Sequence, residues 1–180
     1  DIAQPLMRAL RVRWALEEAG LPYDVRLVSL GAEQKSPEHL ARQPFGQAPA
    51  IEEDGLVMHE SGAIALYIAE KSEVLMPKDR IGRERATAWV FSALNSIENA
   101  VQELGSIIFF HKDAAWAKER RPEVEQFVRP RLGQLAEAGI RTDLFQPRLR
   151  QQHRILQVGA VGPLEQGFAA VALPDLLAGN

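Results

Sequence analysis

The sequence predicts a small α/β unit followed by an all-helical unit. Over residues 1–71 the hydrophobic periodicity changes several times, which indicates short helices and strands. After a break at 72–80, the apolar residues keep a helical spacing to about residue 138. We therefore expect a first domain at 1–71, a linker at 72–80 and a helical domain at 81–180.

The first predicted helix carries Leu6, Leu10 and Trp14 at helical spacing, with arginines and glutamates on much of its other side. Gly20 ends this helix and Pro22 cannot continue it.

A short strand and a short helix are predicted next. Tyr23, Val25 and Leu27 stand at alternate positions, which is typical of a strand over 23–28. Ser36-Pro37 then predicts a brief helix, with the serine as its N-cap and the proline at its first position.

A β-hairpin and a further helix complete the first unit. The run 47–51 contains Pro49, Asp54-Gly55 supplies a tight turn, and 56–58 forms the returning strand. Helical spacing resumes after Ser61 and continues to Lys71.

The second unit is predicted to contain a long helix from Ile81 to about Phe110 and another helix that begins at Pro122. Their expected buried residues are Trp89, Phe91, Leu94, Ile97, Val101, Leu104 and Ile108 in the first, and Val124, Phe127, Val128, Leu132 and Leu135 in the second. We also expect Trp14 and Trp116 in a core or a cleft wall, and His39 and His59 on the surface.

Composition argues against several classes of function. The net charge of −3 gives no cationic surface for nucleic acid or acidic membranes. Without cysteine there is no disulfide or thiolate zinc site, and the four histidines lack metal-ligand spacing. The longest apolar stretches, such as 107–110, are far shorter than the ~20 residues of a membrane span. We therefore expect a cytoplasmic protein with no metal, no membrane and no nucleic acid as partner.

One constellation in the first unit points to ligand binding. A proline at position 49, in a strand, suggests a cis peptide that turns backbone N–H and C=O groups toward a ligand. Glu60-Ser61 follows at the start of a helix, where unpaired N–H groups and the helix dipole favour a carboxylate. The two segments together could hold a peptide by its backbone and by its carboxylate.

These segments resemble the glutathione transferase family. The family pattern Asn-Pro-x-Gly-x-x-Pro, then Asp-Gly, then Glu-Ser-x-Ala-Ile is similar to 44–49, 54–55 and 60–64, and 14–20 resembles the family's first helix. The resemblance covers residues 6 to about 138.

The resemblance implies a thioredoxin-like domain followed by an all-helical domain, as a homodimer that uses glutathione as co-substrate. Ala48 would pair its backbone with the cysteinyl part of glutathione, beside cis Pro49. Glu60 and Ser61 would hold the γ-glutamyl end, and Gln47 would lie near the glycyl end. An apolar electrophile would occupy a cleft against the helical domain, in a reaction of the detoxification type.

The sequence departs from the family where the catalytic hydroxyl or thiol is expected. Family members place Tyr, Ser or Cys near the start of the first helix to stabilise the glutathione thiolate, whose unperturbed pKa is about 8.5. No Ser, Thr, Tyr or Cys occurs before Tyr23, and Met7 stands where many members have the hydroxyl. Arg8 or Gln4 could donate to the sulfur instead, and His111 of the second unit is the other candidate.

Two further departures concern the ends of the chain. The family's first strand is reduced to 1–3, and the chain begins at Asp1 rather than methionine, which leaves open whether residues precede it. Residues 139–180 are atypical, because no Ser/Thr-x-x-Asp capping box follows Ala138. We hypothesise that this tail has lost the family register through a reading-frame slip or a sequencing error.

Two functions remain open on these grounds. The first is a glutathione transferase that conjugates the glutathione thiolate to an electrophilic carbon. The alternative is a non-catalytic glutathione-binding or protein-interaction module on the same scaffold. A glutathione-dependent reductase or isomerase would share the same site, and the reductase is disfavoured because thiol exchange usually requires a cysteine.

Overall fold

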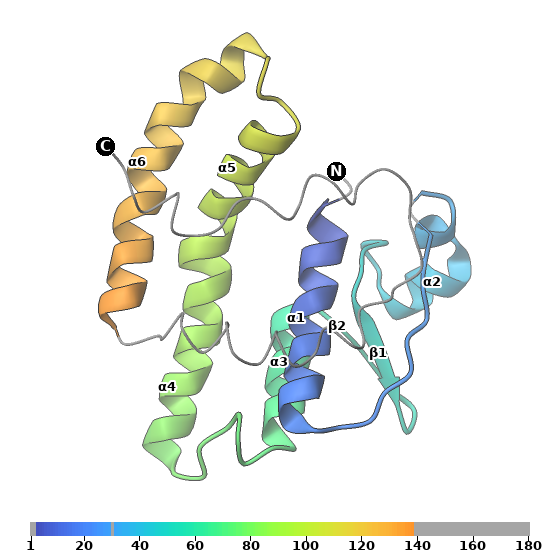
Figure 1. Cartoon of the computed structure of the whole chain (residues 1–180). Coiled ribbons are helices and arrows are strands. Elements are labelled where there is room, and N and C mark those ends of the chain that lie inside the picture. Colours follow the sequence, from blue (N-terminus) through green and yellow to red (C-terminus); the bar gives the residue numbers. More distant parts are fainter. Residues whose placement is uncertain (1–2, 30, 139–180) are drawn as a thin grey trace. The chain divides into compact units, whose positions relative to one another are not determined.

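The computed structural model describes residues 3–29 and 31–138 of the chain (Figure 1). The chain divides between Glu98 and Asn99 into two compact units. A unit defined by its contacts need not coincide with a domain, so the domain limits at 1–71 and 81–180 stay predictions. The hypothesis about 139–180 lies outside the described residues.

The first helix, α1 (Ala3–Ala19), ends where the sequence predicts. Gly20 takes a φ of 66°, the left-handed conformation that glycine adopts without a steric penalty. The N–H of Gly20 donates to the carbonyl of Glu17, and the N–H of Leu21 donates to that of Leu16, both at 3.1 Å. These two bonds form a Schellman motif, which satisfies the last carbonyls of the helix.

The strand predicted over 23–28 is wrong. In the described part of the chain the sheet has two strands, and neither comes from this segment, which has no regular secondary structure. Val25 and Leu27 are exposed to 54% and 73%. A strand requires a neighbour that accepts and donates its ladder hydrogen bonds, and alternation alone does not supply one.

The predicted short helix and hairpin are both present. A 3₁₀ turn, η1 (Glu33–Lys35), leads into α2 (Pro37–Arg42), where the Ser36 side chain accepts a hydrogen bond from the His39 N–H. Strands β1 (Ala50–Glu53) and β2 (Leu56–His59) pair antiparallel. Asp54 and Gly55 have φ values of 49° and 84°, the pair of left-handed residues that a tight hairpin turn needs.

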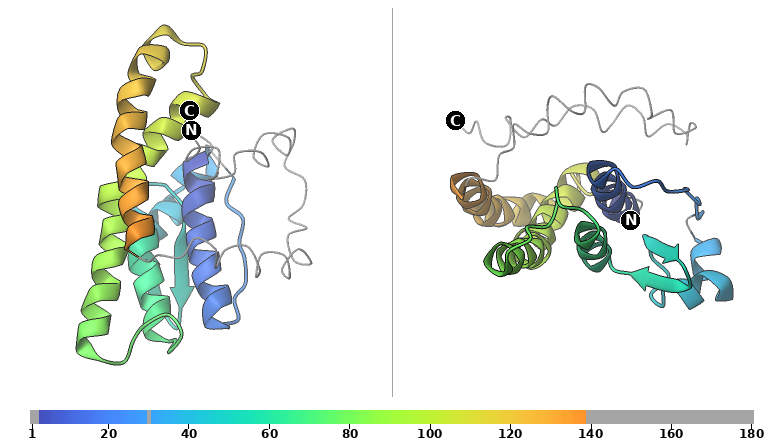
Figure 2. Two further views of the ribbon diagram at one scale, coloured as in Figure 1. Left: turned by 60° about the vertical axis from the view of Figure 1, so that its left-hand side comes forward. Right: turned by 90° about the horizontal axis from the view of Figure 1, so that it is seen from below.

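Helix α3 (Ser61–Glu70) contacts both α1 and the hairpin and supplies most of the first unit's core (Figures 1 and 2). Val12 of α1 packs with Ile64 and Ile68 of α3, all three exposed by less than 5%. Ile51 and Met58 of the hairpin lie against this cluster. The core therefore fixes the start of α3 relative to the hairpin, because each element buries its apolar face against the others.

The long helical stretch predicted from Ile81 is confirmed, but it is not one regular helix. It consists of α4 (Arg80–Phe91), a π-helical segment η2 (Ser92–Glu98) and α5 (Asn99–Phe109). Leu104 is buried as predicted, whereas Trp89, Phe91 and Val101 are each more than 40% exposed, so their burial is wrong. A π-helical turn holds more residues than an α-helical turn, and a constant 3.6-residue period fails across it.

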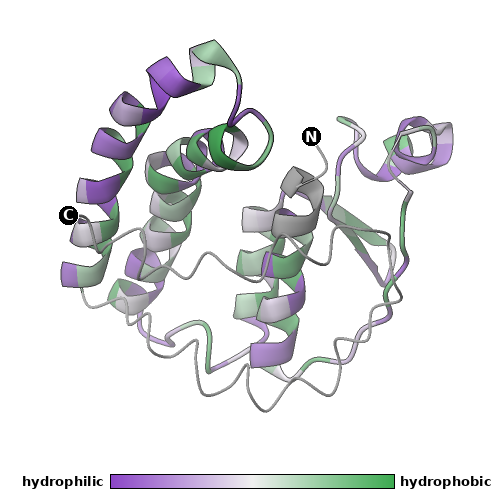
Figure 3. Cartoon of the chain, turned by 45° about the horizontal axis from the view of Figure 1, so that its top comes forward, coloured by the Kyte–Doolittle hydropathy of each residue, from purple (hydrophilic) through white to green (hydrophobic). Residues whose placement is uncertain are grey.

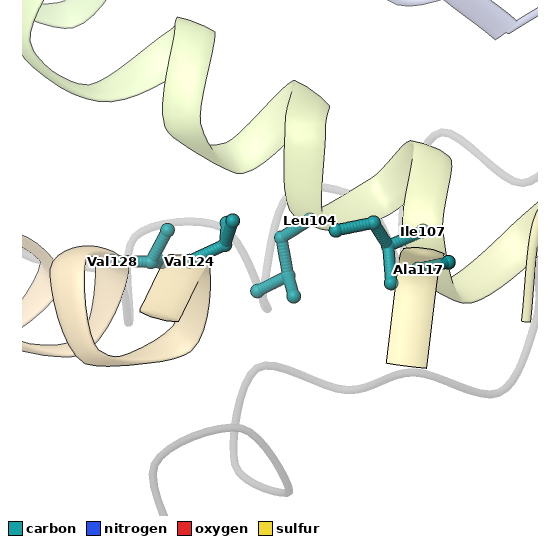
Figure 4. Close-up of a cluster of buried hydrophobic side chains, with 5 residues drawn as sticks. All are labelled: Leu104, Ile107, Ala117, Val124 and Val128. Atoms are coloured by element: carbon teal, nitrogen blue, oxygen red, sulfur yellow. The ribbon is translucent and has the colours of Figure 1, made fainter. Parts of the chain in front are cut away.

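The second unit packs α5 against α6 (Ala115–Glu137). Its buried cluster is shown in Figure 4 and consists of Leu104, Ile107, Ala117, Val124 and Val128. Figure 3 shows hydrophilic residues along the outward side of α6.

The predicted start of the second helix of this unit is wrong, since α6 begins at Ala115 and runs through Pro122 and Pro130. A proline removes one N–H donor from a helix, but its fixed φ is helical. A helix that is stabilised by packing can therefore continue through a proline. Phe127 is also exposed rather than buried, and the Arg131 guanidinium lies 3.4 Å from the centre of its ring.

Among the helices described, none combines the length and the apolar character of a membrane span.

Candidate functional site

The open end of the hairpin brings the two predicted ligand-binding segments together. Ala50 at the start of β1 is the register partner of His59 at the end of β2. Pro49 and Glu60 therefore lie next to each other at one end of the sheet, because opposed residues in an antiparallel pair are about 5 Å apart. The two predicted ligand-binding segments, eleven positions apart in the sequence, are therefore adjacent in space.

The Ala48–Pro49 peptide bond is cis, as expected from the sequence. The preceding loop needs glycine at position 46, where φ is 61°. A Cβ at that position would lie 2.7 Å from the Gln34 carbonyl oxygen and 2.8 Å from Lys35 Nζ. The loop therefore passes directly over η1, and only glycine allows that approach.

The start of α3 has an unusual backbone. Glu60 adopts φ 68° and ψ 111°, a conformation rarely found in residues other than glycine. Its side chain makes no capping hydrogen bond and is exposed, whereas the Ser61 side chain is only 3% exposed. The first N–H groups of α3 are thus presented beside a buried hydroxyl, which is the arrangement that binds carboxylates at helix starts.

Arg11 holds this hydroxyl. Arg11 Nη1 donates to Ser61 Oγ at 2.7 Å, and Arg11 Nη2 donates to Glu98 Oε2 at 2.6 Å. The guanidinium lies between α3 and η2, with its side chain 32% exposed and that of Glu98 14% exposed. Because a hydroxyl has one hydrogen to donate and two lone pairs, the Ser61 hydrogen stays available to a ligand.

Arg8 extends the cluster to the cis-proline loop. Arg8 Nη1 donates to Gln47 Oε1 at 3.1 Å, and Arg8 Nε lies 3.4 Å from Glu98 Oε1. Gln47 and Ser61 are thus connected through two arginines and one glutamate, all within the first unit. The two guanidinium groups share a single carboxylate, so these side chains carry a net positive charge that favours an anionic ligand.

The expectation that His39 lies on the surface is wrong. His39 is only 7% exposed, and its Nε2 lies 2.7 Å from the Gln47 carbonyl oxygen. His59 is half-buried, with its ring 6.2 Å from that of Phe45 in an edge-on contact. The sequence suggested neither position, because each histidine has one polar and one apolar neighbour and neither belongs to a periodic pattern.

His111 belongs to the second unit, two positions after the end of α5, and is exposed. Its ring lies 5.1 Å from that of Trp116, which is 52% exposed and not in a core. A role for His111 at the glutathione thiol stays a prediction. Among residues 3–29 and 31–138, no group of His, Asp or Glu side chains is arranged to hold a metal ion.

Arg11 and Glu98 were not identified from the sequence as site residues. Arg11 lies one helical turn after Arg8, so the i, i+3 spacing on α1 could have placed both on one face. Glu98 carries no such signal, since it reaches the cluster from the π-helical segment.

Comparison with known proteins identifies the first unit's fold. Residues 4–70 match the model of the glutathione S-transferase N-terminal domain, a thioredoxin-like domain. Glutathione S-transferase 1 of Zea mays is 48% identical over 64 residues, which are 35% of this chain and 30% of that protein. A glutathione S-transferase-like protein of Aspergillus terreus is 34% identical over 119 residues, 63% of this chain and 48% of that protein.

A solved glutathione transferase from Burkholderia graminis, which has two glutathione molecules bound per subunit, is also similar. Its TM-score is 0.65 at 33% identity, over 72% of this chain and 57% of that one. The family match over residues 4–70 and these similar proteins together support a member of the glutathione transferase family. It spans less than half the length of the two curated relatives named above.

Proposed function

We propose that the first unit binds glutathione along the Gln47–Pro49 loop and the start of α3, and that the protein conjugates glutathione to electrophiles. The hairpin register, which sets cis Pro49 beside Glu60, is the observation that carries this proposal. A peptide bound at this end can use Ala48 for its backbone and Ser61 for its γ-glutamyl carboxylate. The similarity to glutathione transferases over residues 4–70 supports the same ligand.

The arginine cluster supplies the electrostatics of the proposed reaction. Arg8 lies on the first helix, contacts Gln47 of the glutathione loop, and carries a charge that would lower the pKa of a nearby thiol. The thiolate sulfur attacks the electrophilic carbon, a C–S bond forms, and the leaving group departs with the electron pair of its bond to that carbon. The thiol proton passes to solvent when the thiolate forms.

The test measures binding and turnover separately. Calorimetry with glutathione should give saturable binding, and Ser61→Ala should raise Kd roughly 10- to 100-fold, since a hydrogen bond to a charged group is worth about 1.5–3 kcal/mol. Ser96→Ala, at an exposed serine of η2, is the matched control and should bind like the unaltered protein. No saturation at millimolar glutathione on folded protein would refute the proposal.

Turnover is followed with chlorodinitrobenzene, whose carbon–chlorine bond breaks when the thiolate attacks. Product formation supports a transferase, whereas binding without product assigns the protein to the non-catalytic alternative. Homodimerisation, a cytoplasmic location, a role in detoxification and the contribution of His111 stay predictions.

A further inference from the structure

The main chain of Gln47 is held by two buried side chains of one helical turn. The Gln47 N–H donates to Gln43 Oε1 at 3.2 Å, and the Gln47 carbonyl oxygen lies 2.7 Å from His39 Nε2. Gln43 is 2% exposed and His39 is 7% exposed. Gln43 is the C-cap residue of α2, four positions after His39, and both side chains reach the main chain of Gln47. Neither contact is needed to form the helix itself.

The contact with His39 defines which ring nitrogen carries a hydrogen. A carbonyl oxygen can only accept, so His39 Nε2 must donate. The backbone that carries the ring is itself fixed, because the His39 N–H donates to Ser36 Oγ at 3.2 Å and its carbonyl accepts from the Gln43 N–H at 2.8 Å. His39 therefore offers a donor at a defined point beneath the loop.

The carbonyl that His39 holds belongs to the peptide group that joins Gln47 to Ala48. This peptide is trans, since the cis bond of the loop is the next one, Ala48–Pro49. In a planar trans peptide the N–H points opposite to the C=O. A carbonyl drawn toward the buried side of α2 therefore turns the Ala48 N–H away from α2.

We propose that His39 is a positioning residue for glutathione: its Nε2–H fixes the Gln47–Ala48 peptide plane so that the Ala48 N–H faces the cysteinyl backbone of the tripeptide. This inference rests on the proposed function and adds to it a residue that does not touch the ligand. Without the Nε2–H donor, the Gln47–Ala48 peptide can rotate. Binding of glutathione must then fix this peptide, and the lost conformational entropy weakens the affinity.

The experiment compares His39→Leu, which removes the donor, with His39→Gln, whose amide N–H₂ can occupy the place of Nε2–H. We expect His39→Leu to raise the glutathione Kd and the KM for glutathione by about 10-fold, the equivalent of about one hydrogen bond, with the KM for the electrophile unchanged. His39→Gln should restore most of the affinity. Glu38→Ala is the structural control, because the Glu38 side chain is exposed on the same helix and pairs with Arg26 and Arg42.

The outcomes separate this inference from the proposed function. If Glu38→Ala weakens binding as much as His39→Leu, or if His39→Leu binds like the unaltered protein, the positioning role is wrong. If the unaltered protein binds no glutathione, the proposed function fails first. Should His39→Leu not fold, imidazole ¹⁵N spectra of the unaltered protein decide: a proton on Nε2 that exchanges slowly supports the inference, and its absence overturns it.

Discussion

The junction between α3 and η2 can be tested through Gly62, the residue that directly follows Ser61. A Cβ at position 62 would overlap Leu94 Cδ1 and would lie 3.5 Å from Leu94 Cγ and 3.6 Å from Val90 Cγ1. Carbon atoms pack at about 3.5–4.0 Å, so the first of these contacts cannot persist and Leu94 must move. Gly62→Ala therefore has two opposed effects on stability: it overpacks the contact with Leu94, and it raises the helix propensity of α3.

Overpacking of this kind costs about 1–3 kcal/mol, whereas alanine is favoured over glycine in a helix by up to about 1 kcal/mol. We expect Gly62→Ala to lower the free energy of unfolding by about 1 kcal/mol. In a Leu94→Ala background the obstruction is gone, and Gly62→Ala should instead stabilise by up to about 1 kcal/mol. The coupling between the two positions is then about 2 kcal/mol.

The four proteins of this cycle are compared by urea unfolding, followed by circular dichroism. Gly133→Ala in α6 is the control, because no atom of the described residues lies within 4 Å of the added Cβ, so the change there acts through helix propensity. Gly133→Ala should raise the free energy of unfolding equally in the Leu94 and the Leu94→Ala backgrounds. Equal effects of Gly62→Ala in both backgrounds would show that η2 does not pack on the start of α3 as described.

Three further outcomes are expected. Ile64→Ala should lower the free energy of unfolding by about 2–5 kcal/mol, since Ile64 is fully buried; a urea midpoint close to that of the unaltered protein would contradict the core. Arg8→Ala should raise the pKa of the bound glutathione thiol and move the pH–rate profile to higher pH, while Arg13→Ala leaves it in place; identical profiles would remove Arg8 from the mechanism. The hydrogen bond from Lys71 is the largest cause that holds the pKa of Glu53 below its usual value of 4.5. Its stabilising contribution is present above the unfolded pKa and is lost as pH falls through the folded value, so Glu53→Gln should reduce the loss of stability below about pH 4.5 in acid unfolding.

Local chemistry predicted the backbone of the site well. The end of α1 at Gly20 and the turn at Asp54-Gly55 follow from the conformations that these residues favour. The helix start at Ser61 and the cis bond before Pro49 follow from motifs a few residues long. Each of these features depends on near neighbours in the sequence, which is why the sequence alone could indicate them.

Features that depend on distant partners were predicted poorly. Alternation at 23–28 suggested a strand, but a strand exists only where another strand pairs with it, and periodicity contains no information about that neighbour. The aromatic residues Trp89 and Phe91 were expected to be buried because they are large and apolar. Exposure depends on what covers a residue, and hydrophobicity alone does not specify the cover.

The side chains that orient the proposed site, Arg11, Glu98 and His39, depend partly on near and partly on distant neighbours in the sequence. Arg11 contacts Ser61 from 50 positions away and Glu98 from 87 positions away, so no motif contains all three. A 3.6-residue period continued from α4 also misplaces Glu98, because the π-helical segment shifts the register before that residue. His39, by contrast, lies only eight positions before the carbonyl that it holds. Short motifs therefore specify the backbone of the proposed site, whereas packing specifies the side chains that orient it. Mutations of these orienting side chains should alter glutathione affinity without altering any recognisable motif.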